Sequence, residues 1–292
     1  MSNEAAKGPL TTEQLELFHQ DGYLVVPNVL DNCQDFVDET LRPHLQTYDW
    51  KNLQHFTTGD YDPELHTEIP GAMLRNADGS DPLSDNGQAW ILENETLMAI
   101  LHQLHDSKWE WLHPQNVGWI HVRLLVENAS QFEPRWHVDG GHFSSHYVTS
   151  PEQSVIVLPM LHHVEAQAGN TLVLPKSHHY MAQLLNSKKN GVDKSITQDC
   201  RALGRVWPDV REIAPCRAGD VLLLHPLVVH AAGFHTNPSA DRRITFNMGV
   251  KWTRKLSLEK PTSWLEASLK RSLEETIPKV TVEAPFRLET RA

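Results

Sequence analysis

The sequence contains only 3 cysteines in 292 residues, Cys33, Cys200 and Cys216. They are odd in number and widely spaced, so they provide neither a disulfide framework nor a zinc motif. This usage fits a reducing compartment and predicts a cytoplasmic location. Residues 1–8 are short and polar and lack the apolar core of a signal peptide, which supports the same prediction.

Long apolar runs and a basic excess are also missing. No run approaches the roughly 18 apolar residues that a transmembrane helix requires. Lys and Arg total 26 whereas Asp and Glu total 37, which gives a formal net charge of −11. Binding to phosphates or to an anionic membrane surface relies on basic side chains. We therefore expect neither a nucleic-acid partner nor a membrane.

Nothing in the sequence divides the chain into parts, because it has no Pro-, Gly- or Ser-rich linker, low-complexity run or internal repeat. Its length permits one large β-rich domain or two small ones, and we expect a single domain over residues 1–292. The core is expected at about 10–252, and a helix and tail at 255–292 either pack on it or mediate homodimerisation. Residues 50–90 are irregular, and so long a connection is typical of a lid over a substrate.

Hydrophobic periodicity predicts the regular elements. A helix begins after an N-cap at Thr11 or Thr12 and ends at Asp21-Gly22. The further expected elements are strands at 23–26, 118–126, 154–164, 171–174, 221–224 and 244–252, and helices at 33–47, 92–105, 180–188 and 263–275. Residues 186–208 are predicted to form a polar excursion at the surface.

The tripeptide His137-Val138-Asp139 is the main candidate for chemistry. In an extended strand, residues i and i+2 point to the same side, so the imidazole and the carboxylate would lie side by side. A non-haem Fe(II) centre of the facial-triad type takes two histidines and one carboxylate and leaves its other positions open. Because the sequence has 18 histidines, the tripeptide alone is equally compatible with an ordinary surface or core pair.

A third metal ligand is expected on a distant strand, and His230 is the best candidate. It follows a turn and the apolar run 221–224, and small residues after it leave room for a ligand. Arg242 and Arg243 then open another strand. A guanidinium there can make bidentate hydrogen bonds to a carboxylate, as 2-oxoglutarate would require. Neighbouring strand residues face opposite ways, so only one of the two arginines can serve.

Four segments, in order, resemble the phytanoyl-CoA dioxygenase family of Fe(II)/2-oxoglutarate-dependent oxygenases. They are the opening helix and strand at 10–26, the tripeptide at 137–139, the glycine–threonine strand with its turn at 169–178, and the segment 219–230 with Arg242 beyond it. The resemblance covers roughly residues 10–252. It departs from the family at Lys176, where glycine is frequent, and in a segment before Arg242 that is one residue longer than usual.

The resemblance implies a mainly β protein with packed helices, built on a double-stranded β-helix (jelly-roll, cupin-like) core. It also implies Fe(II), 2-oxoglutarate as cosubstrate, and O2. The residues implied are His137, Asp139 and His230 for the metal, Arg242 rather than Arg243 for the far carboxylate of 2-oxoglutarate, and Thr171 for a hydrogen bond to the same molecule.

The strand at 118–126 places His121 and Arg123 together on the face opposite its apolar side. Such a pair is unusual on a half-buried sheet unless that face lines a polar cavity. We therefore expect His121 or Arg123 to line the site, and the family resemblance implies that such residues bind cosubstrate or substrate. The alternative is that this face is exposed to solvent.

The carboxylate of Asp139 bears on the reaction. Halogenases of this superfamily typically replace it with a small residue, so its presence favours hydroxylation, desaturation or oxidative rearrangement. We expect an oxidoreductase that acts on a small molecule of secondary-metabolite type and releases succinate and CO2. An acyl-CoA hydroxylase remains an alternative, although no basic cluster indicates coenzyme A. A cupin-like isomerase or dioxygenase without 2-oxoglutarate and a non-catalytic binding jelly-roll also remain open.

Overall fold

The computed structural model describes residues 8–31, 33–38, 66–70, 91–112, 118–123, 125, 133–140, 145–152, 154–193, 195–240 and 243–277. The helices are α1 (Thr12–Asp21), α2 (Cys33–Phe36), α5 (Glu95–His105), α6 (Ser177–Ser187), α7 (Ile196–Val206) and α8 (Trp264–Ser272). The strands are β1 (Tyr23–Val26), β2 (His66–Pro70), β3 (Trp109–Trp111), β4 (Trp119–Arg123), β5 (Ile156–Pro159), β6 (Thr171–Val173), β7 (Arg211–Glu212), β8 (Val221–Leu224), β9 (His230–Ala232) and β10 (Ile244–Trp252).

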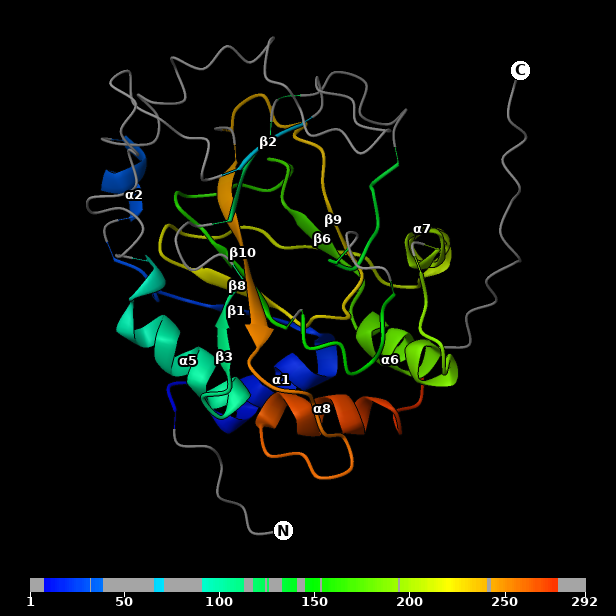
Figure 1. Ribbon diagram of the computed structural model, residues 1–292. Coiled ribbons are helices and arrows are strands. Elements are labelled where there is room, and N and C mark those ends of the chain that lie inside the picture. The colour runs from blue at the N-terminus through cyan, green and yellow to red at the C-terminus, as the bar shows by residue number, and fades with distance from the viewer. Residues whose placement is uncertain are drawn as a thin grey trace, which may run out of the picture.

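Two antiparallel sheets form the centre of the protein, as the expected jelly-roll requires (Figure 1). The larger follows the order β1-β8-β5-β10-β4-β2, with β3 also pairing with β10, and the smaller follows β7-β6-β9. The long strand β10 holds the larger sheet together, because it pairs in turn with β4, β5 and β3. Helices α1, α5 and α8 lie together beside the larger sheet, and α6 and α7 lie beside the smaller one (Figure 1).

The two faces of the larger sheet have different surroundings. On β10, Phe246 and Val250 belong to the apolar core that also includes residues of α1, α5 and α8. The alternate residues face the interior between the sheets, which is apolar around Leu158 and Leu222. The same interior becomes polar at the paired β4 and β10 strands, where His121 lies opposite Thr245. The site described below lies at this polar part.

Helix α1 shows how closely the local sequence determines its ends. Thr11 is the N-cap, and its side chain and that of Gln14 form a reciprocal capping box. Gly22 ends the helix in a left-handed conformation with φ 80°, which glycine adopts without strain. The next residue starts β1, so the predicted helix and strand are both confirmed.

The structure changes the prediction for one segment and leaves parts of two others outside the described residues. Residues 196–206 form α7 instead of a polar surface excursion, because Ile196, Cys200 and Leu203 recur at helical spacing and bury one side. The predicted helix at 33–47 is described only as α2, and residues 39–47 lie outside the described residues. The proposed lid at 50–90 also lies outside them, except for β2, which pairs with β4.

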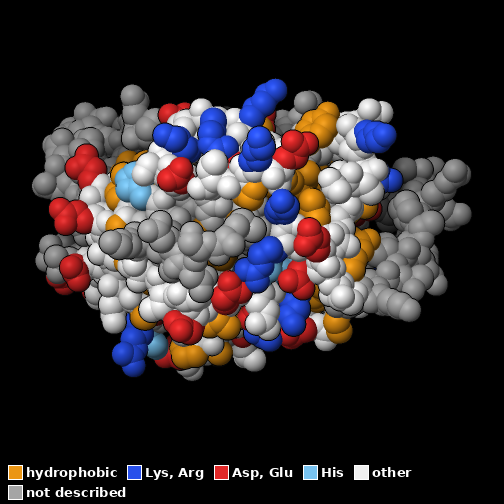
Figure 2. All heavy atoms as spheres, turned by 90° about the horizontal axis from the view of Figure 1, so that it is seen from below, with side chains coloured by type: hydrophobic (Ala, Val, Ile, Leu, Met, Phe, Trp, Pro, Cys, Tyr) orange, Lys and Arg blue, Asp and Glu red, His pale blue; other side chains and the backbone are white. Residues whose placement is uncertain are grey.

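The helical face carries charges of both signs. Seen from below in Figure 2, Lys and Arg side chains alternate with Asp and Glu. Arg271 on α8, for example, forms two hydrogen bonds with Glu16 on α1 at 2.7 and 2.9 Å. The described charges on this face are therefore mixed in sign and partly paired with one another. Within the described helices, none is long and apolar enough to span a membrane.

The buried side chain of His105 links the end of helix α5 to Ser154, which lies just before strand β5. It is fully buried, its Nδ1 contacts the Leu101 carbonyl at 2.8 Å and its Nε2 contacts the Ser154 hydroxyl at 2.6 Å. Burial lowers the pKa of His105 to about 4. Because the unfolded pKa is about 6.5, protonation favours unfolding, and stability is lost as the pH falls from about 6.5 towards 4.

We expect the free energy of unfolding to fall in this interval, with His105 contributing up to about 1.4 kcal/mol per pH unit. Denaturant unfolding of wild type and His105→Gln between pH 7.5 and 4.5 gives the free energy of unfolding at each pH. We expect a plot of this free energy against pH to have a smaller slope in the variant. His163→Gln is the matched control, since the His163 side chain is 55% exposed. Equal slopes for wild type and His105→Gln would contradict the assignment.

Candidate metal centre and cosubstrate site

His137 and His230 lie directly opposite each other on neighbouring extended segments. The backbone N–H of each donates to the carbonyl of the other, both at 2.9 Å, and the two residues form an antiparallel bridge. Opposed residues in such a pair project to the same face. The two ring centroids are accordingly 4.4 Å apart. The backbone thus brings together two residues that are distant in sequence.

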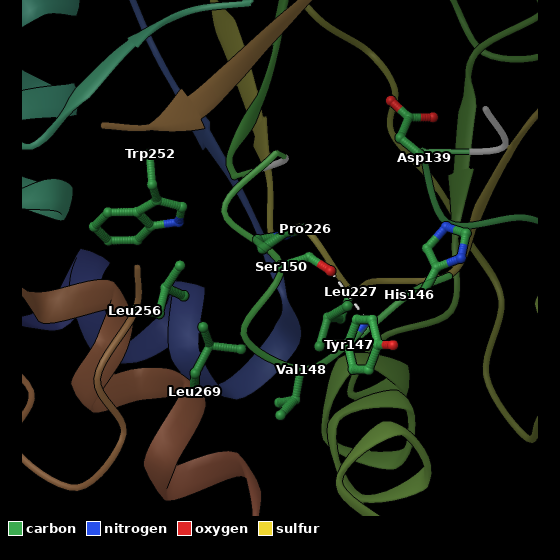
Figure 3. A pocket seen from close by; sticks show the side chains of 10 residues that line it. All are labelled: Asp139, His146, Tyr147, Val148, Ser150, Pro226, Leu227, Trp252, Leu256 and Leu269. Carbon is green, nitrogen blue, oxygen red and sulfur yellow. Dashed lines mark hydrogen bonds between the residues drawn. The ribbon is translucent and has the colours of Figure 1, made fainter. Parts of the chain in front are cut away.

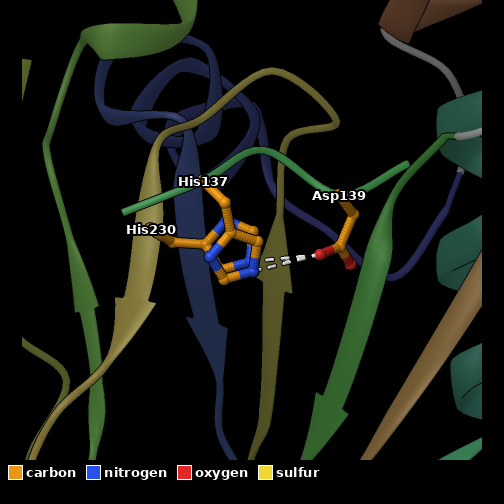
Figure 4. Close-up of side chains that lie close together, drawn as sticks. All are labelled: His137, Asp139 and His230. Atoms are coloured by element: carbon orange, nitrogen blue, oxygen red, sulfur yellow. Dashed lines mark ion pairs between the residues drawn. The ribbon is translucent and has the colours of Figure 1, made fainter. Parts of the chain in front are cut away.

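Asp139 completes the group, as the i and i+2 spacing predicts. Its Oδ1 lies 3.3 Å from Nε2 of His137 and 3.6 Å from Nε2 of His230. Figure 4 shows both rings turned towards this carboxylate. Among the described residues, these three alone form a group suited to a metal ion, with ligand atoms within 4.8 Å of one another. The side chains of His137 and Asp139 are 38% and 25% exposed, so the group is open on one side.

The protonation pattern of the rings fits a cation. Nδ1 of His137 donates to the Arg135 carbonyl at 2.7 Å, and Nδ1 of His230 donates to the Val228 carbonyl at 3.0 Å. Since carbonyls only accept hydrogen bonds, each neutral ring carries its proton on Nδ1 and presents a bare Nε2 to Asp139. Two lone pairs and a carboxylate then converge without a proton between them. A divalent metal with two nitrogen ligands and one oxygen ligand satisfies all three.

The Asp139 carboxylate is held in its charged form. Burial raises the pKa of Asp139, but the interaction of its carboxylate with the His137 and His230 side chains lowers it by more, so the pKa lies well below its usual value. A metal ligand must be deprotonated, and this group meets that requirement.

Arg243 is buried close to this centre, and its hydrogen-bond partners in the described part of the chain are neutral. Its guanidinium donates to Thr171 Oγ1 at 2.8 Å and to the Gly169 carbonyl at 3.2 Å, and it is 2% exposed. Its Nε has no hydrogen-bond partner among the described residues. Burial and then the nearby Arg123 charge lower the pKa of Arg243 to about 9, so it stays cationic at neutral pH. A buried cation bonded only to neutral groups is well suited to bind an anion.

The strand register relates Arg243 to the metal centre. Thr171 on β6 is paired with Ala232 on β9, and Val173 is paired with His230. Thr171 and His230 therefore share a face and are one step of two residues apart, roughly 6–7 Å along the strand. A short dicarboxylate could thus reach from the metal to the guanidinium that Thr171 contacts.

Arg123 and His121 lie on the interior side of β4, as their alternation predicts. An Arg123 guanidinium nitrogen is 3.1 Å from Nδ1 of His121, and Arg123 is 3% exposed. The backbone N–H of Arg123 donates to the Arg243 carbonyl, which keeps the two arginines adjacent. Gly169 is required beside them, because a Cβ at this position, with φ 81°, would lie 2.5 Å from the Arg123 Cβ.

The structure bears differently on two positions singled out from the sequence. Arg242, expected to bind 2-oxoglutarate, lies outside the described residues, whereas Arg243 is the arginine found against Thr171. Lys176, where the sequence departs from the family pattern, adopts a left-handed conformation with φ 68°. This conformation explains why glycine suits that position.

The sequence matches the model of the family described as phytanoyl-CoA dioxygenase (PhyH) over residues 18–244. The chain belongs to the phytanoyl-CoA dioxygenase family. It is an iron- and 2-oxoglutarate-dependent oxygenase, as the sequence predicted. Comparison with curated protein sequences gives no match.

Solved structures give the same fold for this member of the phytanoyl-CoA dioxygenase family. It is similar to the epimerase SnoN in complex with Fe3+, alpha ketoglutarate and nogalamycin RO, with a TM-score of 0.56, 19% identity, and coverage of 94% of this chain and 92% of the other. The match to the carbocyclase SnoK has a TM-score of 0.57 and 16% identity, and it covers 93% of this chain and 94% of SnoK. The match to HygX from Streptomyces hygroscopicus, with nickel and 2-oxoglutarate bound, has a TM-score of 0.50 and 18% identity. It covers 84% of this chain and 88% of HygX. At these identities the likeness establishes the fold alone.

Asp139→Gly tests the metal centre. Removal of the only carboxylate of the group should weaken Fe(II) binding by about 100-fold or more and abolish iron-dependent turnover. Anaerobic Fe(II) titration and 2-oxoglutarate consumption measure the two effects. Glu165→Gly is the matched control, because His163 and Glu165 form an exposed pair of the same spacing at 2.7 Å. A wild-type rate in Asp139→Gly would exclude Asp139 as a ligand.

Proposed function

We propose that this enzyme oxidises a small-molecule, secondary-metabolite substrate by hydroxylation, desaturation or oxidative rearrangement, with conversion of 2-oxoglutarate to succinate and CO2. One observation carries the proposal: a His-Asp-His group lies one strand step from a buried arginine whose hydrogen bonds, within the described chain, go only to neutral groups. When bound, iron with 2-oxoglutarate and O2 supplies the oxidising chemistry.

The residues have separate roles in this proposal. His137, Asp139 and His230 hold Fe(II) on one side and leave the opposite side for cosubstrate and O2. The carbonyls of Arg135 and Val228 fix the orientation of the two rings through their Nδ1 protons. We assign the far carboxylate of 2-oxoglutarate to Arg243, in place of Arg242, with Thr171 as a second donor. Arg123, whose guanidinium contacts Nδ1 of His121, adds positive charge near that carboxylate.

The kind of substrate follows by analogy from the similar structures. SnoN and HygX have been solved with nogalamycin RO and hygromycin B, respectively, which are small molecules. An acyl-CoA substrate is less well supported, because the cations described near the centre are used by the 2-oxoglutarate site. The cytoplasmic location is also part of the proposal, since Cys33, Cys200 and Cys216 are all buried and free.

The assignment of Arg243 leads to a direct test. In Arg243→Gln the affinity for 2-oxoglutarate should fall about 100-fold, since loss of one partner of a buried charge pair costs about 2–5 kcal/mol. Fe(II) affinity should stay unchanged, because Arg243 does not belong to the metal group. Anaerobic calorimetric titration of the Fe(II)-loaded protein with 2-oxoglutarate measures this difference.

Arg242→Gln is the matched control, since it removes the same charge one residue earlier. Wild-type affinity is expected for that variant. If Arg242→Gln loses the affinity and Arg243→Gln keeps it, the register first expected from the sequence is right and the assignment to Arg243 is wrong.

A further inference from the structure

Strand β5 separates from β10 before β10 reaches its first residue. The pairing between them ends with the bridge between Met160 and Thr245, and the chain then bends at His162. Within the described chain, backbone pairing with β5 therefore stops one residue short of Ile244, where β10 begins.

The backbone N–H of Ile244 points to the side that β5 has left. On the other side of β10, the Arg123 N–H donates to the Arg243 carbonyl at 3.0 Å, so these two residues occupy a hydrogen-bonded position of the β4–β10 pairing. The next pair, Ile244 with Val122, is then of the non-hydrogen-bonded kind, and its N–H groups point away from the partner strand. Because Ile244 is only 3% exposed, its N–H needs an acceptor from the protein.

The side chain of His162 supplies this acceptor. Its Nδ1 lies 2.7 Å from the His163 carbonyl, and its Nε2 lies 3.0 Å from the Ile244 nitrogen. Because a carbonyl only accepts hydrogen bonds, the ring carries its proton on Nδ1, and the bare Nε2 accepts from the Ile244 N–H. His162 is buried, so the hydrogen bond is shielded from water.

This hydrogen bond fixes the peptide unit that follows the Arg243 side chain. The carbonyl of the unit is held by the Arg123 N–H from β4, and its N–H, that of Ile244, is held by His162. A peptide unit is planar, so two hydrogen bonds from opposite sides set both its position and its orientation. The Arg243 side chain leaves the backbone next to this unit and reaches Thr171 on β6 at 2.8 Å.

We propose that His162 is a positioning residue for 2-oxoglutarate: as a neutral acceptor for the Ile244 N–H, it holds Arg243 where its guanidinium meets the far carboxylate. The inference rests on the proposed function, because it takes Arg243 as the anchor of that carboxylate. Without the acceptor, the start of β10 has other positions open to it, and only a fraction of the molecules presents Arg243 correctly. The apparent affinity for 2-oxoglutarate falls in proportion to that fraction.

Three substitutions separate the acceptor from the rest of the side chain. His162→Leu removes the acceptor and keeps a buried apolar side chain, whereas His162→Gln keeps an oxygen acceptor of similar reach. His163→Leu is the matched control, because it removes the neighbouring imidazole, which is 55% exposed, and leaves the backbone carbonyl in place.

Anaerobic calorimetric titration of the Fe(II)-loaded proteins with 2-oxoglutarate measures the effect. We expect about 10-fold weaker binding in His162→Leu, and affinities close to wild type in His162→Gln and His163→Leu. The Fe(II) affinity should be the same in all of them, since His162 acts on the arginine and not on the metal ligands. Wild-type affinity in His162→Leu, or the same loss in His162→Gln as in His162→Leu, would overturn the proposal.

A double-mutant cycle tests whether His162 acts through Arg243. In the Arg243→Gln background, His162→Leu should cause no further loss of 2-oxoglutarate affinity, because the side chain that His162 positions is already gone. If the two losses are instead independent, so that their fold-changes multiply in the double variant, the proposed role is wrong.

Nitrogen-15 NMR of histidine-labelled wild-type protein tests the same geometry without a destabilising variant. The His162 signals, identified by their loss in His162→Gln, should show a proton on Nδ1 and none on Nε2 at neutral pH. A proton on Nε2 would overturn the proposal even if His162→Leu does not fold.

The outcomes distinguish this inference from the proposed function. A loss of 2-oxoglutarate affinity in Arg243→Gln without one in His162→Leu overturns the positioning role alone. Unchanged affinity in Arg243→Gln overturns the assignment of Arg243 made under the proposed function, and the positioning role with it.

Discussion

The metal centre depends on one backbone pairing, the two hydrogen bonds between His137 and His230. These bonds set the two rings on one face, and the extended backbone after His137 then delivers the Asp139 carboxylate to the same place. The pairing also attaches residues 133–140, which form no strand within the described range, to the edge of the smaller sheet. The strand pairing that forms the sheet edge therefore also sets the geometry of the metal ligands. If the 137–139 segment shifted by one residue against β9, the side chains of His137 and Asp139 would point to the opposite face.

A second constraint is the burial of positive charge between the sheets. Arg243 and Arg123 are 2% and 3% exposed, and a backbone hydrogen bond keeps them adjacent. Burial of the Arg243 cation, whose hydrogen-bond partners among the described residues are neutral, opposes folding unless an anion compensates. A bound dicarboxylate would offset this cost, so 2-oxoglutarate is expected to stabilise the folded protein as well as to take part in the reaction. Gly169 permits the close approach that places Arg123 there.

The parts that the sequence predicted correctly are those with a short-range cause. The ends of α1 follow from Thr11, Gln14 and Gly22, and the strand alternation put His121 and Arg123 together on the face of β4 opposite its apolar side. The meeting of His137 with His230 was inferred from the residue types that a facial triad needs and from family resemblance. No local pattern encodes that contact.

Other features depended on tertiary contacts that the sequence does not show. The choice between Arg242 and Arg243 depends on where β10 meets β4, and a single residue reverses it. Helix α7 was missed because its three buried residues are spread among many polar ones. A pocket beside Asp139 combines a loop, a turn, a strand end and a helix (Figure 3), so no single segment indicates it.

The most direct measurement is an anaerobic titration of the Fe(II)-loaded protein with 2-oxoglutarate, followed by visible absorption. A 2-oxo acid chelated to ferrous iron gives a weak charge-transfer band at roughly 500–530 nm. We predict this band for the wild-type protein and its loss in His230→Ala. If iron binds and no band forms, the protein does not bind 2-oxoglutarate at a His137-Asp139-His230 iron centre, and the account is contradicted.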